Sequence, residues 1–180
     1  MNSLQLLPVG DIDWRVIETL RTGLLRYFRA SCDVLDAIAL PDYAFNAERQ
    51  QYCSSEILNR MGIHAHRGCW RLLAITPVDL YIPILTFVFG EAQMGGPNAV
   101  ISTFRLRQEF YGLPADRDLL NDRLLKEAVH ELGHTLQLTH CRDYYCAMAP
   151  SHAVEWIDLK DSQFCNTCQE KVLARYVSVE

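Results

Sequence analysis

The chain has 180 residues, 49% of them hydrophobic and 22% charged, which is typical of one globular domain and excludes a disordered chain. A formal net charge of −5 and the lack of a Lys/Arg-rich run argue against a nucleic-acid partner. The longest apolar run, residues 80–90, contains Pro83 and is too short to cross a bilayer, so no membrane partner is expected. The N-terminus resembles no signal peptide, which predicts a cytoplasmic protein in a reducing compartment.

The first part of the chain predicts strands that alternate with helices. We expect strands at 3–9, 32–40 and 69–76, and helices from Asp11 or Asp13 to Phe28 and at 46–60. Strands separated by helices favour a mostly parallel sheet. Two further strands are expected at 85–93 and 99–106, and the Gly-rich turn between them suggests an exposed, bulged edge.

Residues 117–137 are the most clearly helical segment, with Asp116 or Asp118 as the N-terminal cap. Its predicted apolar stripe consists of Leu125, Val129, Leu132 and Leu136. At about 100° per residue, His130 and His134 lie roughly 130° and 170° from the centre of that stripe. The two histidines are therefore expected to face a cleft rather than the core.

His130, Glu131 and His134 form an H-E-x-x-H segment, and His140 follows six residues later. Side chains at i and i+4 of a helix are neighbours, which suits two imidazoles that share one zinc ion. Glu131 would take a proton from the attacking water and pass it to the leaving amine. On a continuous helix His140 would lie about 240° round and about 9 Å along from His134, so the motif requires a sharp turn near 137–138. Without His140, a solvated histidine pair would be an equally good interpretation.

Four cysteines follow in two close pairs, Cys141 with Cys146 and Cys165 with Cys168. In a reducing cell this spacing favours a closed structural zinc site over an iron–sulfur cluster or two labile disulfides. Neighbouring side chains of an extended chain point to opposite sides, so His140 can face one metal while Cys141 faces the other. The cysteine site would then stabilise the segment that presents His140.

The remaining cysteines and histidines lack such spacing. We expect buried apolar thiols at Cys32, Cys53 and Cys69. His64 and His66 are expected in a surface turn, although alternating histidines can bind metal. His152 either lines a substrate pocket or lies in solvent.

The segment HELGHTLQLTHC, the following CAM and the later FCNTC resemble the archaemetzincins, a branch of the metzincin zinc peptidases. The resemblance covers residues 130–168, and FVFGEAQMGG followed by AVIST also resembles the edge-strand region of the family. It implies a catalytic zinc on His130, His134 and His140, a general base at Glu131, and a second zinc on Cys141, Cys146, Cys165 and Cys168. It also implies that Met148 is the methionine of the Met-turn, beneath the three imidazoles, and that residues 87–92 pair with an extended peptide.

Two positions depart from the family pattern. Gln137 stands where the family usually has glycine, at a turn where a non-glycine residue in a left-handed conformation costs about 1–2 kcal/mol. Pro150 replaces the tyrosine that some metzincins place two residues after the methionine, which leaves Tyr144, Tyr145 or His152 as candidates to stabilise the oxyanion. Asp158 and Lys160 resemble the family's D-x-K spacing and are expected in the terminal helix.

These observations predict one α/β (α+β) metzincin-like domain over residues 1–180, with a mixed, mostly parallel twisted sheet and an active-site helix. An upper lobe would extend to about residue 137, and a small lower lobe, stabilised by the structural zinc ion, would occupy 138–180. The predicted protein is a zinc-dependent metallopeptidase with two Zn²⁺ per chain and a peptide or protein substrate. The alternatives are a catalytically quiet zinc-binding scaffold and a zinc amidase for a small substrate; the sequence does not predict the oligomeric state.

Overall fold

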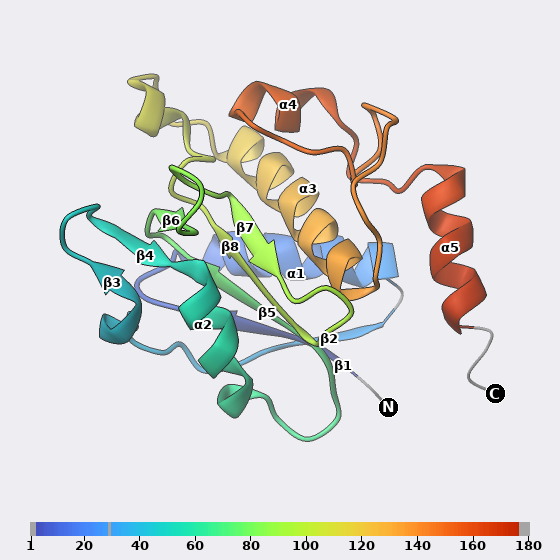
Figure 1. Cartoon of the computed structure of the whole chain (residues 1–180), viewed down its shortest axis with the longest axis horizontal. Helices are drawn as coiled ribbons and strands as arrows, with labels where there is room; N and C mark the ends of the chain where they lie inside the picture. Colours follow the sequence, from blue (N-terminus) through green and yellow to red (C-terminus); the bar gives the residue numbers. More distant parts are fainter. Residues whose placement is uncertain (1–2, 29, 177–180) are drawn as a thin grey trace.

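In the computed structural model, which describes residues 3–28 and 30–176, a central sheet lies between two layers of helices (Figure 1). The sheet has five strands in the order β2-β1-β5-β8-β7, and a second, three-stranded sheet has the order β3-β4-β6. The strands of the large sheet are β1 (Ser3–Pro8), β2 (Ser31–Val34), β5 (Cys69–Thr76), β7 (Gly90–Ala92) and β8 (Asn98–Ser102). Those of the small sheet are β3 (Phe45–Asn46), β4 (Gln51–Cys53) and β6 (Leu80–Tyr81).

The described residues also form five α-helices and three 3-10 helices. The α-helices are α1 (Trp14–Phe28), α2 (Ser54–Met61), α3 (Arg117–Thr135), α4 (Val154–Leu159) and α5 (Asn166–Tyr176). The 3-10 helices are η1 (Asp42–Ala44), η2 (Gly62–His64) and η3 (Gln108–Tyr111). The predicted α/β class with a mixed, mostly parallel sheet is confirmed by the large sheet, in which β2, β1, β5 and β8 pair in parallel and β7 runs antiparallel. In the small sheet, β4 pairs with β6 in parallel and with β3 antiparallel.

The alternation of side chains along the central strands explains the layers. Leu73 and Ile75 of β5 pack with α1 and α3, whereas Leu72 and Ala74 of the same strand pack with α2. Successive residues of a strand point to opposite faces, so apolar residues at every position require a cover on both sides. α1 and α3 therefore cover one face of the sheet and α2 covers the other (Figure 1).

The prediction of a helix over 46–60 is wrong in its first half. Asn46 ends β3, and its side-chain oxygen accepts the backbone N–H groups of Glu48 and Arg49, both at 3.0 Å. Gln50 then takes a left-handed φ of 54°, and β4 pairs back onto β3. An asparagine that bonds to its own following backbone favours a turn, and here it outweighs the helical preference of the next residues. The helix begins only at Ser54.

Three predicted strands are shorter than expected, and the one predicted over 99–106 ends at Ser102. The pairing of 32–40 with β1 ends at Val34, and beyond it only Ile38 forms an isolated bridge. Within 85–93, only Gly90–Ala92 pair with β8, as the last strand of the sheet. The edge position is as predicted, but the bulge is not, because the β7–β8 register is regular.

Residues after 137 have a small apolar cluster of their own, made of Leu138, Cys146, Met148 and Cys168. This cluster supports the division into two lobes near residue 137, which stays a prediction. The expectation that Asp158 and Lys160 lie in the terminal helix is wrong: Asp158 belongs to α4, and Lys160 caps its end. Among the described residues, no helix is long and apolar enough to cross a membrane.

Candidate metal centres and active site

Three histidines meet at the C-terminal end of α3. His130 and His134 come from its last two turns, His140 comes from the chain beyond it, and their ligating nitrogens lie within 4.8 Å of one another. The Nε2 atoms of His130 and His134 are 3.1 Å apart. Two nitrogens at 2.0–2.1 Å from one tetrahedral zinc ion would be about 3.4 Å apart, so the pair fits such an ion with a small adjustment.

The sharp turn that the motif requires is made at Gln137. The helix ends at Thr135, Leu138 donates its N–H to the Gly133 carbonyl at 3.0 Å, and Gln137 has a left-handed φ of 64°. The Gln137 side chain lies against Gly95 of the β7–β8 loop, where an added Cβ would stand 2.8 Å from Gln137 Cγ. The strained position that glycine usually occupies is thus held here by a glutamine with a packing partner.

Backbone carbonyls orient the two helical histidines. Nδ1 of His130 donates to the Ala147 carbonyl and Nδ1 of His134 to the Leu138 carbonyl, both at 2.8 Å. With Nδ1 protonated, each ring keeps the lone pair of Nε2 for a metal. Burial lowers the pKa of all three histidines, that of His130 most strongly with the nearby Lys160 as the second cause, so the neutral ligand form is favoured.

Glu131 is 5% exposed and lies beside the edge strand. An added Cβ on Gly90 would stand 2.8 Å from Glu131 Cγ and 3.0 Å from its Oε1, so the carboxylate arm passes directly over that glycine. Burial raises the pKa of Glu131 well above its usual value, and the charge of Glu127 raises it further. A buried carboxylate with a raised pKa is suited to accept and return a proton.

A cavity of about 420 Å³ opens over this group, and its lining includes all three histidines and Glu131. The edge-strand side contributes mainly apolar residues, among them Ile82, Leu85, Phe87, Phe89, Ala92 and Met94. The far side contributes Pro150, Ser151 and His152. Of the three candidates for oxyanion stabilisation, His152 is exposed but lines the cavity, whereas Tyr144 and Tyr145, 63% and 66% exposed, are not among its lining residues.

The burial of α3 differs from the expectation. Leu132 and Val129 of the predicted stripe are in the core, but Leu125 is only partly buried, and the histidine face is itself covered by the chain after residue 137. The helix is therefore enclosed on most sides, and its histidines reach the cavity from within the protein.

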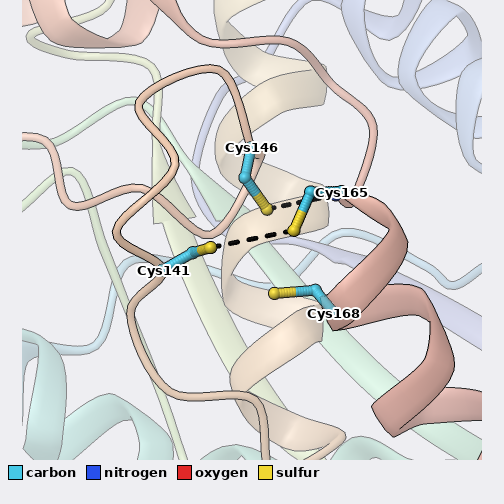
Figure 2. Close-up of side chains that lie close together, drawn as sticks. All are labelled: Cys141, Cys146, Cys165 and Cys168. Atoms are coloured by element: carbon cyan, nitrogen blue, oxygen red, sulfur yellow. Dashed lines mark hydrogen bonds between the residues drawn. The ribbon is translucent and has the colours of Figure 1, made fainter.

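Four cysteine sulfurs converge at the start of α5, as Figure 2 shows. Cys141 and Cys146 come from the loop after α3, Cys165 directly precedes α5, and Cys168 lies in its first turn. All four ligand atoms lie within 4.8 Å of one another, and the Cys141–Cys165 sulfur distance is 3.8 Å. Zinc–sulfur bonds of 2.3 Å in a tetrahedron would place the sulfurs about 3.8 Å apart.

The surroundings of these sulfurs suit a bound cation. Cys146 Sγ accepts the backbone N–H groups of Met148 and Cys165 at 3.4 and 3.3 Å. Burial raises the pKa of Cys146 and of Cys168, so these thiols need a cation to become thiolates. His140 belongs to the histidine group and Cys141 to the cysteine group, as expected for neighbours in extended chain.

Met148 is fully buried beneath α3. A Cβ on Gly133 would lie 2.3 Å from Met148 Sδ, so the sulfur fills the space that this glycine leaves on the helix. The role that the resemblance implies for Met148, an apolar floor beneath the three imidazoles, stays a prediction.

The secondary candidates are only partly as expected. Cys32 is buried at 6% exposure, but Cys53 and Cys69 are only half-buried. His64 ends η2 and His66 lies in the following loop, apart from both metal groups. Sequence reasoning missed Gly90 and the buried pair of Glu127 and Lys160; the D-x-K spacing was the one signal that pointed to Lys160.

A helix with two histidines and a buried glutamate, a third histidine beyond a turn, and a cavity over all four residues define the chain as a zinc metalloprotease.

The comparisons agree with this class. The model of peptidase family M54 matches residues 38–174. The archaemetzincin of Methanocaldococcus jannaschii is 41% identical over 96% of this chain and 94% of its own. The crystal structure of the Archaeoglobus fulgidus archaemetzincin, complexed with malonate, is 36% identical with a TM-score of 0.83, covering 94% of this chain and 99% of that one. The crystal structure of a zinc-dependent peptidase from Methanocorpusculum labreanum has a TM-score of 0.86 and is 26% identical, covering 94% of this chain and 99% of that one. The chain belongs to peptidase family M54, the archaemetzincins.

Proposed function

We propose that the chain hydrolyses peptide bonds at the histidine site, with Glu131 as general base and acid. The observation that carries this proposal is the convergence of three histidine nitrogens within 4.8 Å at a cavity that Glu131 also lines. His130, His134 and His140 would hold the zinc ion. When bound, zinc would act as a Lewis acid that polarises the scissile carbonyl and lowers the pKa of water, so that water loses a proton more easily and becomes a better nucleophile.

Glu131 would move the proton in this reaction. Its carboxylate is buried, and the raised pKa allows it to take a proton from the attacking water and to deliver it to the leaving amine. Gly90 contributes by leaving room for the carboxylate arm beside the edge strand. His152, which lines the same cavity, is the side chain that we propose to bind the oxyanion.

The substrate would be a peptide or protein in extended form. β7 is the last strand of the sheet, and its residues Gly90–Ala92 line the cavity, so a peptide can add to this edge through backbone hydrogen bonds. The apolar wall near Phe87 and Phe89 favours an apolar side chain next to the scissile bond.

The four cysteines would hold a second, structural zinc ion. They leave no position open to substrate, which distinguishes a structural from a catalytic site. Four thiolate ligands persist in a reducing compartment, so we place the protein in the cytoplasm.

Peptide-library turnover with measured zinc content tests the catalytic role. We expect Glu131→Ala to lower kcat/KM by at least about 100-fold at unchanged zinc content, since general acid–base catalysis contributes about 10²–10⁴-fold. The exposed Glu48 provides the control variant, Glu48→Ala, which should keep full activity.

Wild-type protein that carries zinc at the histidines yet cleaves no peptide would instead support a quiet scaffold. Turnover restricted to small amides would support an amidase. Activity that survives in Glu131→Ala would reject Glu131 as the base.

A further inference from the structure

Lys160 is among the most deeply buried residues of the protein, although its side chain is charged. It is 2% exposed at the end of α4, and its Nζ lies 2.8 Å from Glu127 Oε1 of α3. The side chains of this pair are 1% and 4% exposed. Burying a charge is costly unless it is paired, so a pair retained at this depth calls for a role.

A second ion pair between the same elements provides a comparison. Asp158, two residues before Lys160, forms a two-bond ion pair with Arg123, with both distances 2.7 Å. Arg123 and Glu127 are one helical turn apart on α3, so the D-x-K spacing matches two successive turns of that helix. The Asp158 side chain is 35% exposed. Both pairs fasten α4 to α3, but only the Lys160 pair lies against the metal-binding residues.

The Lys160 ammonium contacts two parts of the histidine site. Its Nζ lies 3.4 Å from His130 Nδ1 and 3.4 Å from the Ala149 carbonyl. Because His130 Nδ1 donates to the Ala147 carbonyl, it has no lone pair for Lys160, and the ammonium donates to the Ala149 carbonyl instead. Lys160 therefore holds the short 147–149 segment, and this segment accepts the proton of the His130 ring.

We propose that Lys160, held in place by Glu127, is a positioning residue for the histidine metal site. It fixes the orientation of the His130 ring and of the segment beneath it, so that Nε2 of His130 points at the metal. This inference rests on the proposed function, because it takes His130 as a zinc ligand. Outer groups that orient ligating histidines typically change metal affinity or activity by about 10–100-fold when they are lost.

Zinc affinity measured by chelator competition, together with the visible spectrum of the Co²⁺-substituted protein, tests the proposal without relying on activity. Lys160→Met should weaken zinc binding at the histidines by about 10–100-fold and change the cobalt d–d bands. The unpaired Glu127 should also lower Tm by roughly 10 °C. The sulfur-to-cobalt charge-transfer bands of the cysteine site should stay unchanged.

The double variant Lys160→Met with Glu127→Met separates positioning from stability. Replacing a buried ion pair by apolar side chains of similar size is often neutral for stability, so Tm should recover. Weak zinc binding that persists at a recovered Tm supports the positioning role. Recovery of zinc affinity together with Tm would overturn it, because the pair would then act only on stability.

Two further variants keep the test decisive if the double variant does not fold. Glu127→Asp retains both charges but withdraws the carboxylate by one methylene group. This variant should bind zinc more weakly with little change in Tm. Unchanged zinc affinity would reject the proposal. Asp158→Asn, which breaks the outer pair, should lower Tm but leave zinc affinity intact. Wild-type protein without zinc at the histidines would contradict the proposed function itself, whereas normal zinc binding in every variant would contradict only the role of Lys160.

Discussion

Gly90 leaves room for Glu131, the proposed general base. A Cβ at this position would stand 2.8 Å from Glu131 Cγ and 2.8 Å from the Val100 carbonyl. Gly90 pairs with Ile101 in the sheet, so an added methyl group would displace the glutamate arm and would also force a small shift of the backbone at the Val100 carbonyl.

Gly90→Ala should therefore lower kcat/KM by up to about 100-fold, since a shift of about 1 Å in a catalytic group can cost that much. Zinc content should not change, because the three atoms nearest to the added methyl group belong to Glu131 and Val100 and not to a histidine. Steady-state kinetics with metal analysis provides the measurement, and Gly62→Ala is the matched control, since its nearest neighbour would be Asn98 Nδ2 at 3.4 Å. Equal activity of both variants would show that Glu131 has room to move.

At the scale of elements, local patterns predicted most of what surrounds the site. The α3 helix, its Asp116 cap and the need for a turn at 137 all follow from local spacing, and the cap is observed with Leu119 donating at 2.9 Å. The β3–β4 hairpin was missed because a single Asn46 side chain outweighs a helical pattern. The pair of Glu127 and Lys160 was missed because it joins segments 33 residues apart, and no local pattern encodes that contact.

The cysteine group lies in the segment that presents His140. Ala147, Val154 and Ile157 tie the segment between α3 and α5 to the main core, whereas the residues next to His140 have only the small cluster of Leu138, Cys146, Met148 and Cys168. A zinc ion on the cysteines would add free energy of folding there, because His140 lies directly before the first of these ligands. The third histidine would then depend on the cysteine site for its position.

Cys165→Ser should reduce the zinc content from two ions to about one per chain and should also weaken zinc binding at the histidines. Metal analysis after dialysis measures the first effect, and chelator competition measures the second. Cys53→Ser, which changes a half-buried thiol outside both metal groups, should keep two zinc ions. A wild-type protein that binds a single zinc ion would contradict the model of two sites.

At the scale of the whole molecule, the fold encloses the helical side of the histidine site between the sheet edge, α3 and the chain beyond residue 137, with His130 buried, His134 half-buried and His140 exposed. This enclosure has an electrostatic consequence. Burial, with Lys160 as a further contributor, lowers the pKa of His130, and burial also lowers those of His134 and His140 below the usual 6.5. Lowered pKa values favour the neutral rings at a lower pH than for free histidine.

The direction in which pH changes zinc affinity follows from these lowered pKa values. Zinc competes with protons for the ligand nitrogens, and affinity falls about tenfold per pH unit for each proton that must leave. With lowered pKa values the histidines hold their protons only at a lower pH, so the decline of zinc affinity on acidification should begin at a lower pH than the 6.5 expected for free histidine. Chelator competition between pH 5.5 and 7.5, at constant free zinc, measures this profile. A steep decline that begins at pH 6.5 would mean that the histidines are solvated like free imidazole and that the enclosure is not maintained in solution.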